Sequence, residues 1–259
     1  AGSPGMAIGG LVGANIASCL LAVGLAATIA PSTVPESLIR RDGSALTVAT
    51  LLFVAWGTSF PLGPASGLAM LALFALYLWM IGGETSRGES RGQPANMADG
   101  RRHETLRATR NIPLGGALAF AAAGLVLVVH GGRTFVEGAV HLAQSIGVSE
   151  SIIGLSVVAL ATTIPALVAS VAAARRGESG LALGNAINAC LFNLLGAGGL
   201  IGIIGPVPIP AGVAHFDYPV LVAATLLVLV LASTGRRIAR PEGIALTACY
   251  GIYLYALFR

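Results

Sequence analysis

Long apolar runs recur along the whole chain and leave it few options other than a bundle of membrane-spanning helices. Each run has about 18 to 25 residues, the length at which a helix rising about 1.5 Å per residue crosses the hydrocarbon core of a bilayer. We predict eight spans, with the fourth extending as far as 146 at most: 4–30, 44–60, 62–82, 113–135, 148–174, 179–205, 216–235 and 242–258. A content of 55% apolar and 10% charged residues is typical of a multi-pass membrane protein.

The basic residues indicate how these spans are oriented. All fifteen are arginines, and thirteen of them lie in four alternate loops, around 40–41, 87–110, 175–176 and 236–240. Because positive residues are retained on the cytoplasmic side, these loops are predicted to be cytoplasmic. The same placement accounts for the net charge of +4 without a nucleic-acid partner. We expect an integral protein of a bacterial inner membrane.

Two stretches of the chain read as copies of one another. Residues 7–31 and 182–206 align without gaps at an offset of 175, with nine of 25 positions identical. The arginine pattern makes the two copies antiparallel. Inverted repeats of this kind build many secondary transporters, whose substrate site lies near the bilayer midplane. At the same offset, the partner of span 148–174 would precede residue 1, so we expect at least one further helix before this sequence.

The repeat predicts how the chain is divided. Residues 1–82 would form the remainder of the first repeat, with three helices, and residues 113–259 the second repeat, with five. Between them, residues 83–112 combine both charges with glycine and proline, which is typical of a flexible cytoplasmic linker.

Polar residues in the middle of two spans mark a candidate site. The segment 162–165 (Thr-Thr-Ile-Pro) would break the first span, and Asn185, Asn188 and Asn193 lie in the next. Such groups persist at membrane depth where they face protein or water rather than lipid. An ordinary proline kink with threonine hydroxyls bonded to their own helix would also explain the first segment. Hydrogen bonds between helices would equally explain Asn185 and Asn188.

Four segments carry a resemblance to a known family: GGRTFVEGAV (131–140), SESIIGLSVVALATTIPALVAS (149–170), the helix at 182–206 and TGRRIARPEG (234–243). In them the chain resembles the sodium/calcium exchanger superfamily, in particular its bacterial calcium/sodium antiporter branch. The resemblance implies an all-α membrane fold of ten helices in two inverted halves, of which this chain would hold the last eight. It also implies secondary antiport of Na⁺ and Ca²⁺ by alternating access, with inorganic cations and the lipid bilayer as partners, no cofactor and no enzymatic activity.

The resemblance also implies a set of candidate cation ligands. The family's Gly-Thr-Ser-x-Pro-Glu motif survives here as two hydroxyls and a proline, while its acidic position is Ala166. On the facing helix and in the first repeat, the family's Gly-Ser-Asn-x-x-Asn/Asp motif retains only part of its oxygen ligands. The candidate ligands are therefore Thr162, Thr163, Asn193, Ser18 and Asn15.

The missing carboxylate bears on which ion is exchanged. Ca²⁺ takes six to eight oxygen ligands, usually including carboxylates. With Ala166 at the acidic position, we expect Ca²⁺ exchange to be impaired and selectivity among Na⁺, H⁺ and K⁺ to be altered. The same loss motivates an alternative from another class, a membrane scaffold or partner subunit that keeps the fold without transporting.

Two further sets of residues have alternative interpretations. His130, Glu137 and His141 would share one face of a helix, which a proton relay or a metal site could use, but a solvated face where the helix leaves the membrane explains them more simply. An intramembrane metalloenzyme is a further alternative, but no His-Glu-x-x-His pattern accompanies these residues. Cys19, Cys190 and Cys249 lie in apolar spans without the spacing of a metal cluster or disulfide framework, so we interpret them as small buried hydrophobic residues.

Overall fold

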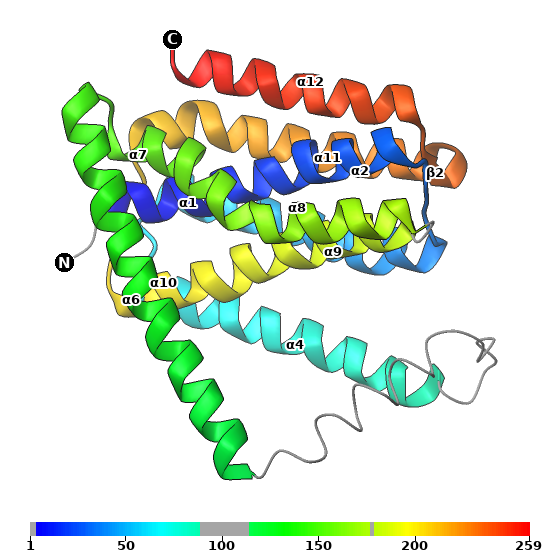
Figure 1. Ribbon diagram of the computed structural model, residues 1–259, viewed down its shortest axis with the longest axis horizontal. Helices are drawn as coiled ribbons and strands as arrows, with labels where there is room; N and C mark the ends of the chain where they lie inside the picture. The colour runs from blue at the N-terminus through cyan, green and yellow to red at the C-terminus, as the bar shows by residue number, and fades with distance from the viewer. Residues whose placement is uncertain (1–3, 89–113, 177–178) are drawn as a thin grey trace. The chain divides into compact units, whose positions relative to one another are not determined.

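Helical segments lie over each of the predicted spans in the described part of the chain (Figure 1). The structure is a computed structural model, and it describes residues 4–88, 114–176 and 179–259. In chain order the segments are α1 (Pro4–Ala17), η1 (Ser18–Ala22), α2 (Val23–Ile29), η2 (Leu38–Gly43), α3 (Ser44–Ser59), α4 (Pro64–Gly88), α6 (Leu114–Ile146), α7 (Glu150–Ile153), η3 (Gly154–Val158), α8 (Ala159–Arg175), α9 (Ser179–Leu191), η4 (Phe192–Ala197), α10 (Gly198–Ile204), η5 (Val213–Asp217), α11 (Tyr218–Ser233), η6 (Thr234–Arg236) and α12 (Arg240–Leu257). The prediction of an all-helical membrane protein agrees with this order, apart from two-residue strands β1 (Ser32–Thr33) and β2 (Arg237–Ile238).

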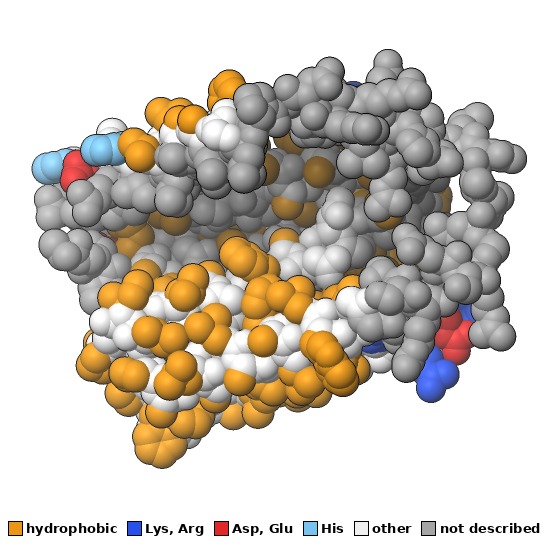
Figure 2. All heavy atoms as spheres, turned by 90° about the horizontal axis from the view of Figure 1, so that it is seen from below, with side chains coloured by type: hydrophobic (Ala, Val, Ile, Leu, Met, Phe, Trp, Pro, Cys, Tyr) orange, Lys and Arg blue, Asp and Glu red, His pale blue; other side chains and the backbone are white. Residues whose placement is uncertain are grey.

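The surface of the helices suits a lipid environment. Large apolar side chains point outward, such as Leu68, Ile204 and Ile252, which are 61%, 88% and 67% exposed. Figure 2 shows apolar side chains spread over the described part of one face. Five helical stretches of the described chain are long and apolar enough to cross a membrane: Gly5–Ile29, Pro64–Gly82, Glu150–Arg175, Gly180–Ile204 and Val213–Arg236. That the other helices also cross the membrane stays a prediction.

The helix boundaries repeat along the chain at the offset found in the sequence. The helix α2 begins at Val23 and ends at Ile29, and α10 begins at Gly198 and ends at Ile204, 175 residues further on in both cases. The wide π turns η1 and η4 precede them, and the π turns η2 and η5 precede α3 and α11. In Figure 1 the run from α1 to α2 and the run from α9 to α10 point in opposite directions. The copies are therefore antiparallel.

Glycines allow close helix crossings that also recur in both copies. A Cβ built on Gly243 of α12 would lie 2.7 Å from the main-chain oxygen of Gly24 in α2. A Cβ on Gly67 of α4 would lie 2.5 Å from the main-chain oxygen of Gly199 in α10. These crossings therefore bring backbone against backbone. Short main-chain pairings accompany them, Ser32 with Ile238 and Leu62 with Val207.

The contacts separate the chain into two units, which we describe one at a time. Residues 1–77 and 139–259 form the first unit and residues 78–138 the second. The first unit holds both copies of the repeat, and the second the end of α4 and most of α6. The predicted division into 1–82, 83–112 and 113–259 stays a prediction. Within the predicted linker, α4 continues to Gly88, and 89–112 lie outside the described residues.

Candidate functional site

The segments that carry the candidate ligands meet inside the first unit. The π turn η1 contacts both α8 and α9, and α1 contacts η3, α8 and η4. The close approach of α1 to η3 and α8 depends on Gly13 of α1. A Cβ added there would lie 2.5 Å from the main-chain oxygen of Leu155 and 2.7 Å from the Cβ of Ala159. The absence of a side chain at Gly13 therefore lets α1 lie directly on the helix that bears the threonines.

Two candidate ligands of the first repeat are fully buried. Asn15 is 0% exposed; its amide nitrogen donates to the carbonyl of Leu11 at 2.7 Å, and its Oδ1 has no hydrogen-bond partner among the described residues. Ser18 is 2% exposed and opens the π turn η1. A buried amide oxygen without a partner is costly, so Asn15 offers a ready acceptor to a cation or a proton donor.

The two threonines differ in where they lie. Thr163 is buried and Thr162 is exposed. The Thr163 hydroxyl donates to the carbonyl of Ala159 at 2.7 Å, and the Thr162 hydroxyl to that of Val158 at 2.9 Å. Both hydroxyls are therefore bonded to their own helix, as the alternative interpretation from the sequence has it.

The predicted helix break at 162–165 is wrong. The helix α8 runs without interruption from Ala159 to Arg175 with Pro165 inside it. The irregularity lies one turn earlier instead, in the π turn η3, and the threonine hydroxyls bond carbonyls in the turn before the proline. The neighbouring Ala166, at the acidic position, is half-buried.

The asparagines of the second copy differ in burial and in partners. Asn193 is half-buried and lies in the π turn η4, whereas Asn185 and Asn188 are exposed, and Asn188 also accepts a hydrogen bond from another helix. In η4 the main-chain amide of Gly198 donates to the main-chain oxygen of Asn193, and in η1 the main-chain amide of Val23 donates to the main-chain oxygen of Ser18. Ser18 and Asn193, which correspond to one another in the family resemblance, thus each accept a main-chain hydrogen bond from the residue five positions later.

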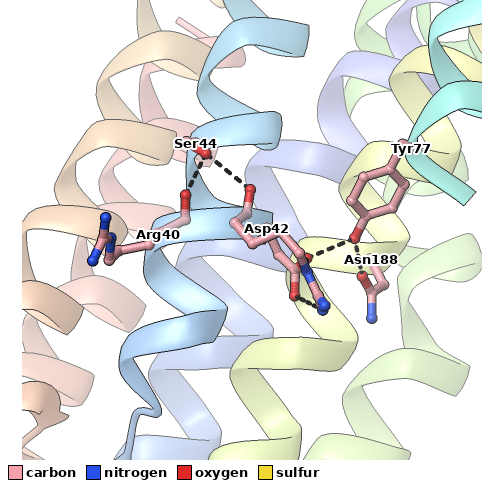
Figure 3. Close-up of polar contacts among 6 residues, drawn as sticks. Arg40, Asp42, Ser44, Tyr77 and Asn188 are labelled. Carbon is pink, nitrogen blue, oxygen red and sulfur yellow. Dashed lines mark hydrogen bonds and ion pairs between the residues drawn. The ribbon is translucent and has the colours of Figure 1, made fainter. Parts of the chain in front are cut away.

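A polar network centred on the buried Asp42, which the sequence analysis did not single out, lies beside this region (Figure 3). Asp42 is 2% exposed and makes a two-pronged pair with Arg41, with Nε to Oδ1 at 2.6 Å and Nη2 to Oδ2 at 3.0 Å. The hydroxyl of Tyr77, on α4, lies 3.2 Å from Asp42 Oδ1 and 2.9 Å from Asn188 Oδ1. The network therefore joins the first repeat to the helix α9 of the second.

The second repeat contains a counterpart of this aspartate. Asp217 lies 175 residues after Asp42, is 2% exposed, and accepts a hydrogen bond from the hydroxyl of Tyr253 at 2.8 Å. Extending the sequence alignment past residue 31 at the same offset would have found both aspartates.

The histidines and cysteines considered from the sequence differ in their exposure. His130, Glu137 and His141 are exposed on α6, and no group of three His, Cys, Asp or Glu side chains suited to a metal occurs in the described ranges. Cys19 and Cys190 are buried as predicted, but the prediction for Cys249 is wrong because its side chain faces outward on α12.

Comparison with known proteins gives concordant matches over almost the whole chain. The family described as sodium/calcium exchanger protein matches residues 1–83 and 116–259. The putative antiporter CaxA of Alkalimonas amylolytica is 33% identical over 255 residues, covering 97% of this chain and 78% of the relative. The sodium/calcium exchanger MaX1 of Methanosarcina acetivorans is 29% identical over 281 residues, covering 98% and 80%.

Further matches agree with these. The inner membrane protein YrbG of Escherichia coli is 30% identical over 263 residues, covering 98% of this chain and 77% of that protein. Among solved structures, the sodium-calcium exchanger NCX_Mj soaked with Na⁺ and Sr²⁺ superimposes with a TM-score of 0.67 at 27% identity, covering 98% of this chain and 77% of the other.

Proposed function

This chain belongs to the sodium/calcium exchanger family, and from that premise we propose how its residues serve secondary cation antiport. The exchanger fold and the family resemblance that the sequence predicted are confirmed, and the relatives favour antiport over a non-transporting scaffold. The chain is a multi-pass membrane protein, and a bacterial inner membrane is the location we propose, in line with the name of YrbG.

The paired π turns are the observation that best supports a cation path between the two copies. The main-chain oxygens of Ser18 and Asn193 each accept the hydrogen bond from the amide five residues later that defines their π turn. Such turns inside α-helices are found frequently at functional sites. Asn15 adds a buried amide oxygen without a partner. We assign the path to Asn15, Ser18, Thr163 and Asn193, with Thr162 at its exposed edge.

The path works by alternating access in this proposal. Antiparallel copies that pack through glycine crossings can exchange two arrangements related by an approximate two-fold axis, each opening the centre to one side. Ions that compete for the same oxygen ligands then couple their movements, because the protein carries one or the other. No covalent step is required.

The substitution at the acidic position sets the ion preference. Among the described residues of the path, the ligands are hydroxyl and amide oxygens, which are neutral. Such ligands accommodate Na⁺, K⁺ or a proton donor better than Ca²⁺, which needs charged oxygen ligands to replace its water. We therefore propose that the chain exchanges monovalent cations more effectively than Ca²⁺.

Restoring the carboxylate tests this preference. In vesicles reconstituted with the full-length protein, Ala166→Glu is expected to raise sodium-gradient-driven uptake of radioactive Ca²⁺ about tenfold or more, since about 1.4 kcal/mol of added ion binding corresponds to tenfold. The neutral control Ala166→Gln has a similar size and should leave uptake low. Uptake by the unaltered protein equal to that of Ala166→Glu would refute the proposal.

A further inference from the structure

Two buried cysteines face each other where the copies cross, although they are 171 residues apart in the chain. The Sγ atoms of Cys19, in η1, and Cys190, in α9, lie 3.9 Å apart. The two residues are 3% and 1% exposed. The Sγ of Cys190 also lies 3.7 Å from the main-chain oxygen of Asn15. Spacing along the sequence could not reveal this pair, because each cysteine belongs to a different copy of the repeat.

The separation of the sulfurs suits a shared metal ion. In a tetrahedral thiolate site with metal–sulfur bonds of about 2.3 Å, two ligating sulfurs are about 3.8 Å apart. A disulfide would need the sulfurs at about 2.05 Å. The observed 3.9 Å therefore lets both thiolates bind one ion with little movement of either helix.

The residues beside the thiols carry further oxygen atoms, since the main-chain oxygen of Asn15 lies 3.7 Å from the Sγ of Cys190. The Oδ1 of Asn15 is buried and has no hydrogen-bond partner among the described residues. The hydroxyl-bearing Ser18 directly precedes Cys19 in the same π turn. Two sulfurs with one or two oxygens make a coordination set that zinc and cadmium accept.

We infer that Cys19 and Cys190 form a two-thiolate site for a soft or borderline divalent cation of the zinc and cadmium class. Binding converts two thiols and one M²⁺ into a neutral M(SR)₂ unit and releases two protons to water. Neutrality matters at this depth, because an uncompensated charge inside a membrane is costly. Hard cations such as Ca²⁺ gain little from sulfur ligands, so the pair discriminates against them.

An effect on transport follows, and this step rests on the proposed function. One thiolate comes from each copy, so a bound ion ties η1 to α9. Alternating access requires the copies to move relative to one another, and such a tie opposes that movement. Zinc or cadmium is therefore expected to inhibit exchange rather than to be carried.

Direct binding to the purified full-length protein tests the site without relying on transport. Titration with Cd²⁺ in detergent is expected to produce the near-ultraviolet thiolate-to-cadmium charge-transfer band, saturating at one ion per chain. Cys19→Ala and Cys190→Ala should each weaken binding by about 100-fold or more, because removal of even a supporting group costs about 10- to 100-fold. Cys249→Ala is the matched control, since that thiol is exposed on α12, and it should bind as the unaltered protein does.

The outcomes separate the site from the transport proposal. Absence of the band, or a band that persists in Cys19→Ala/Cys190→Ala protein, overturns the site; equal melting temperatures of the variants show that they are folded. A band in protein that transports nothing supports the site and contradicts only the proposed function. Transport that continues when the band is saturated overturns the inhibitory role.

Discussion

The two buried aspartates, Asp42 and Asp217, occupy equivalent positions in the two repeats, but only Asp42 is paired with a basic side chain. Asp42 is held by the guanidinium of Arg41 and by Tyr77. Asp217 is held by Tyr253, and no arginine or histidine in the described ranges makes an ion pair with it. At the position equivalent to Arg41 stands Phe216, whose ring stacks on that of Tyr253 with centroids 6.2 Å apart.

The difference shows which of these interactions occurs in both copies of the repeat. Both copies keep a π turn that buries an aspartate and a tyrosine that donates to it from a later helix. The basic partner is present in one copy and replaced by an aromatic ring in the other. The aspartate–tyrosine bond is therefore the shared structural element, whereas the charge pair is particular to the first repeat.

The surroundings of the two carboxyl groups differ as well. Asp217 borders a cavity of about 340 Å³ that Ser149 and Ser151 also line. Asp42 is enclosed by its partners, and Tyr77 connects it to Asn188 on the helix that carries Asn193. The first-repeat aspartate is thus fixed within a network, while the second-repeat aspartate borders open space.

Removing the two charges separately should give the largest difference in stability between the two copies. Asp42→Asn removes the carboxylate charge that Arg41 bonds at two points, and we expect a loss of about 2 kcal/mol in unfolding free energy, below the usual range of about 3–5 kcal/mol because Arg41 is 31% exposed. Asp217→Asn keeps an acceptor for Tyr253 and removes a buried charge without a base, so stability should change by less than about 0.5 kcal/mol. Denaturant titration in detergent measures both, and equal losses would contradict the comparison.

The glycine crossings test what the copies share. Gly67→Ala would place a Cβ 2.5 Å from the oxygen of Gly199, and Gly243→Ala would place one 2.7 Å from the oxygen of Gly24. Neither main-chain oxygen can move without shifting its helix, so each substitution should lower the unfolding free energy by about 1 to 3 kcal/mol. The two losses should be similar. Gly251→Ala, on α12 with open space around it, is the control. A large effect in one crossing alone would show that the copies are not equivalent there.

Much of the architecture was accessible from the sequence because bilayer physics restricts it. Apolar runs of fixed length predict the spans, an ungapped offset of 175 predicts the two copies, and the positions of the arginines predict that the copies are antiparallel. The same offset relates Asp42 to Asp217, but identical residues are sparse around this pair. Patterns that recur along the sequence thus predict the membrane spans and the internal repeat.

The local geometry was less accessible, because it depends on contacts between distant segments. Pro165 suggested a broken helix, yet the irregularity is a π turn at 154–158, whose sequence has no proline. Cys19 and Cys190 looked unrelated until packing placed them together. Asn188 was equally compatible with a ligand and with a helix–helix bond, and only the position of Tyr77 distinguishes them.

The tyrosine variants should reverse the order of the aspartate variants, with the larger loss of stability in the second repeat. Tyr253→Phe leaves the buried carboxyl of Asp217 without its side-chain donor, which should cost about 1 to 2 kcal/mol. Tyr77→Phe should cost less than about 1 kcal/mol, because Asp42 keeps both bonds from Arg41. The same denaturant titration in detergent applies, with Tyr255→Phe, an exposed tyrosine of α12, as the control. A larger loss for Tyr77→Phe than for Tyr253→Phe would mean that the bond from Tyr77 to Asn188 stabilises the fold more than the bond from Tyr253 to Asp217 does. The difference between the two aspartate sites would then not arise from Arg41.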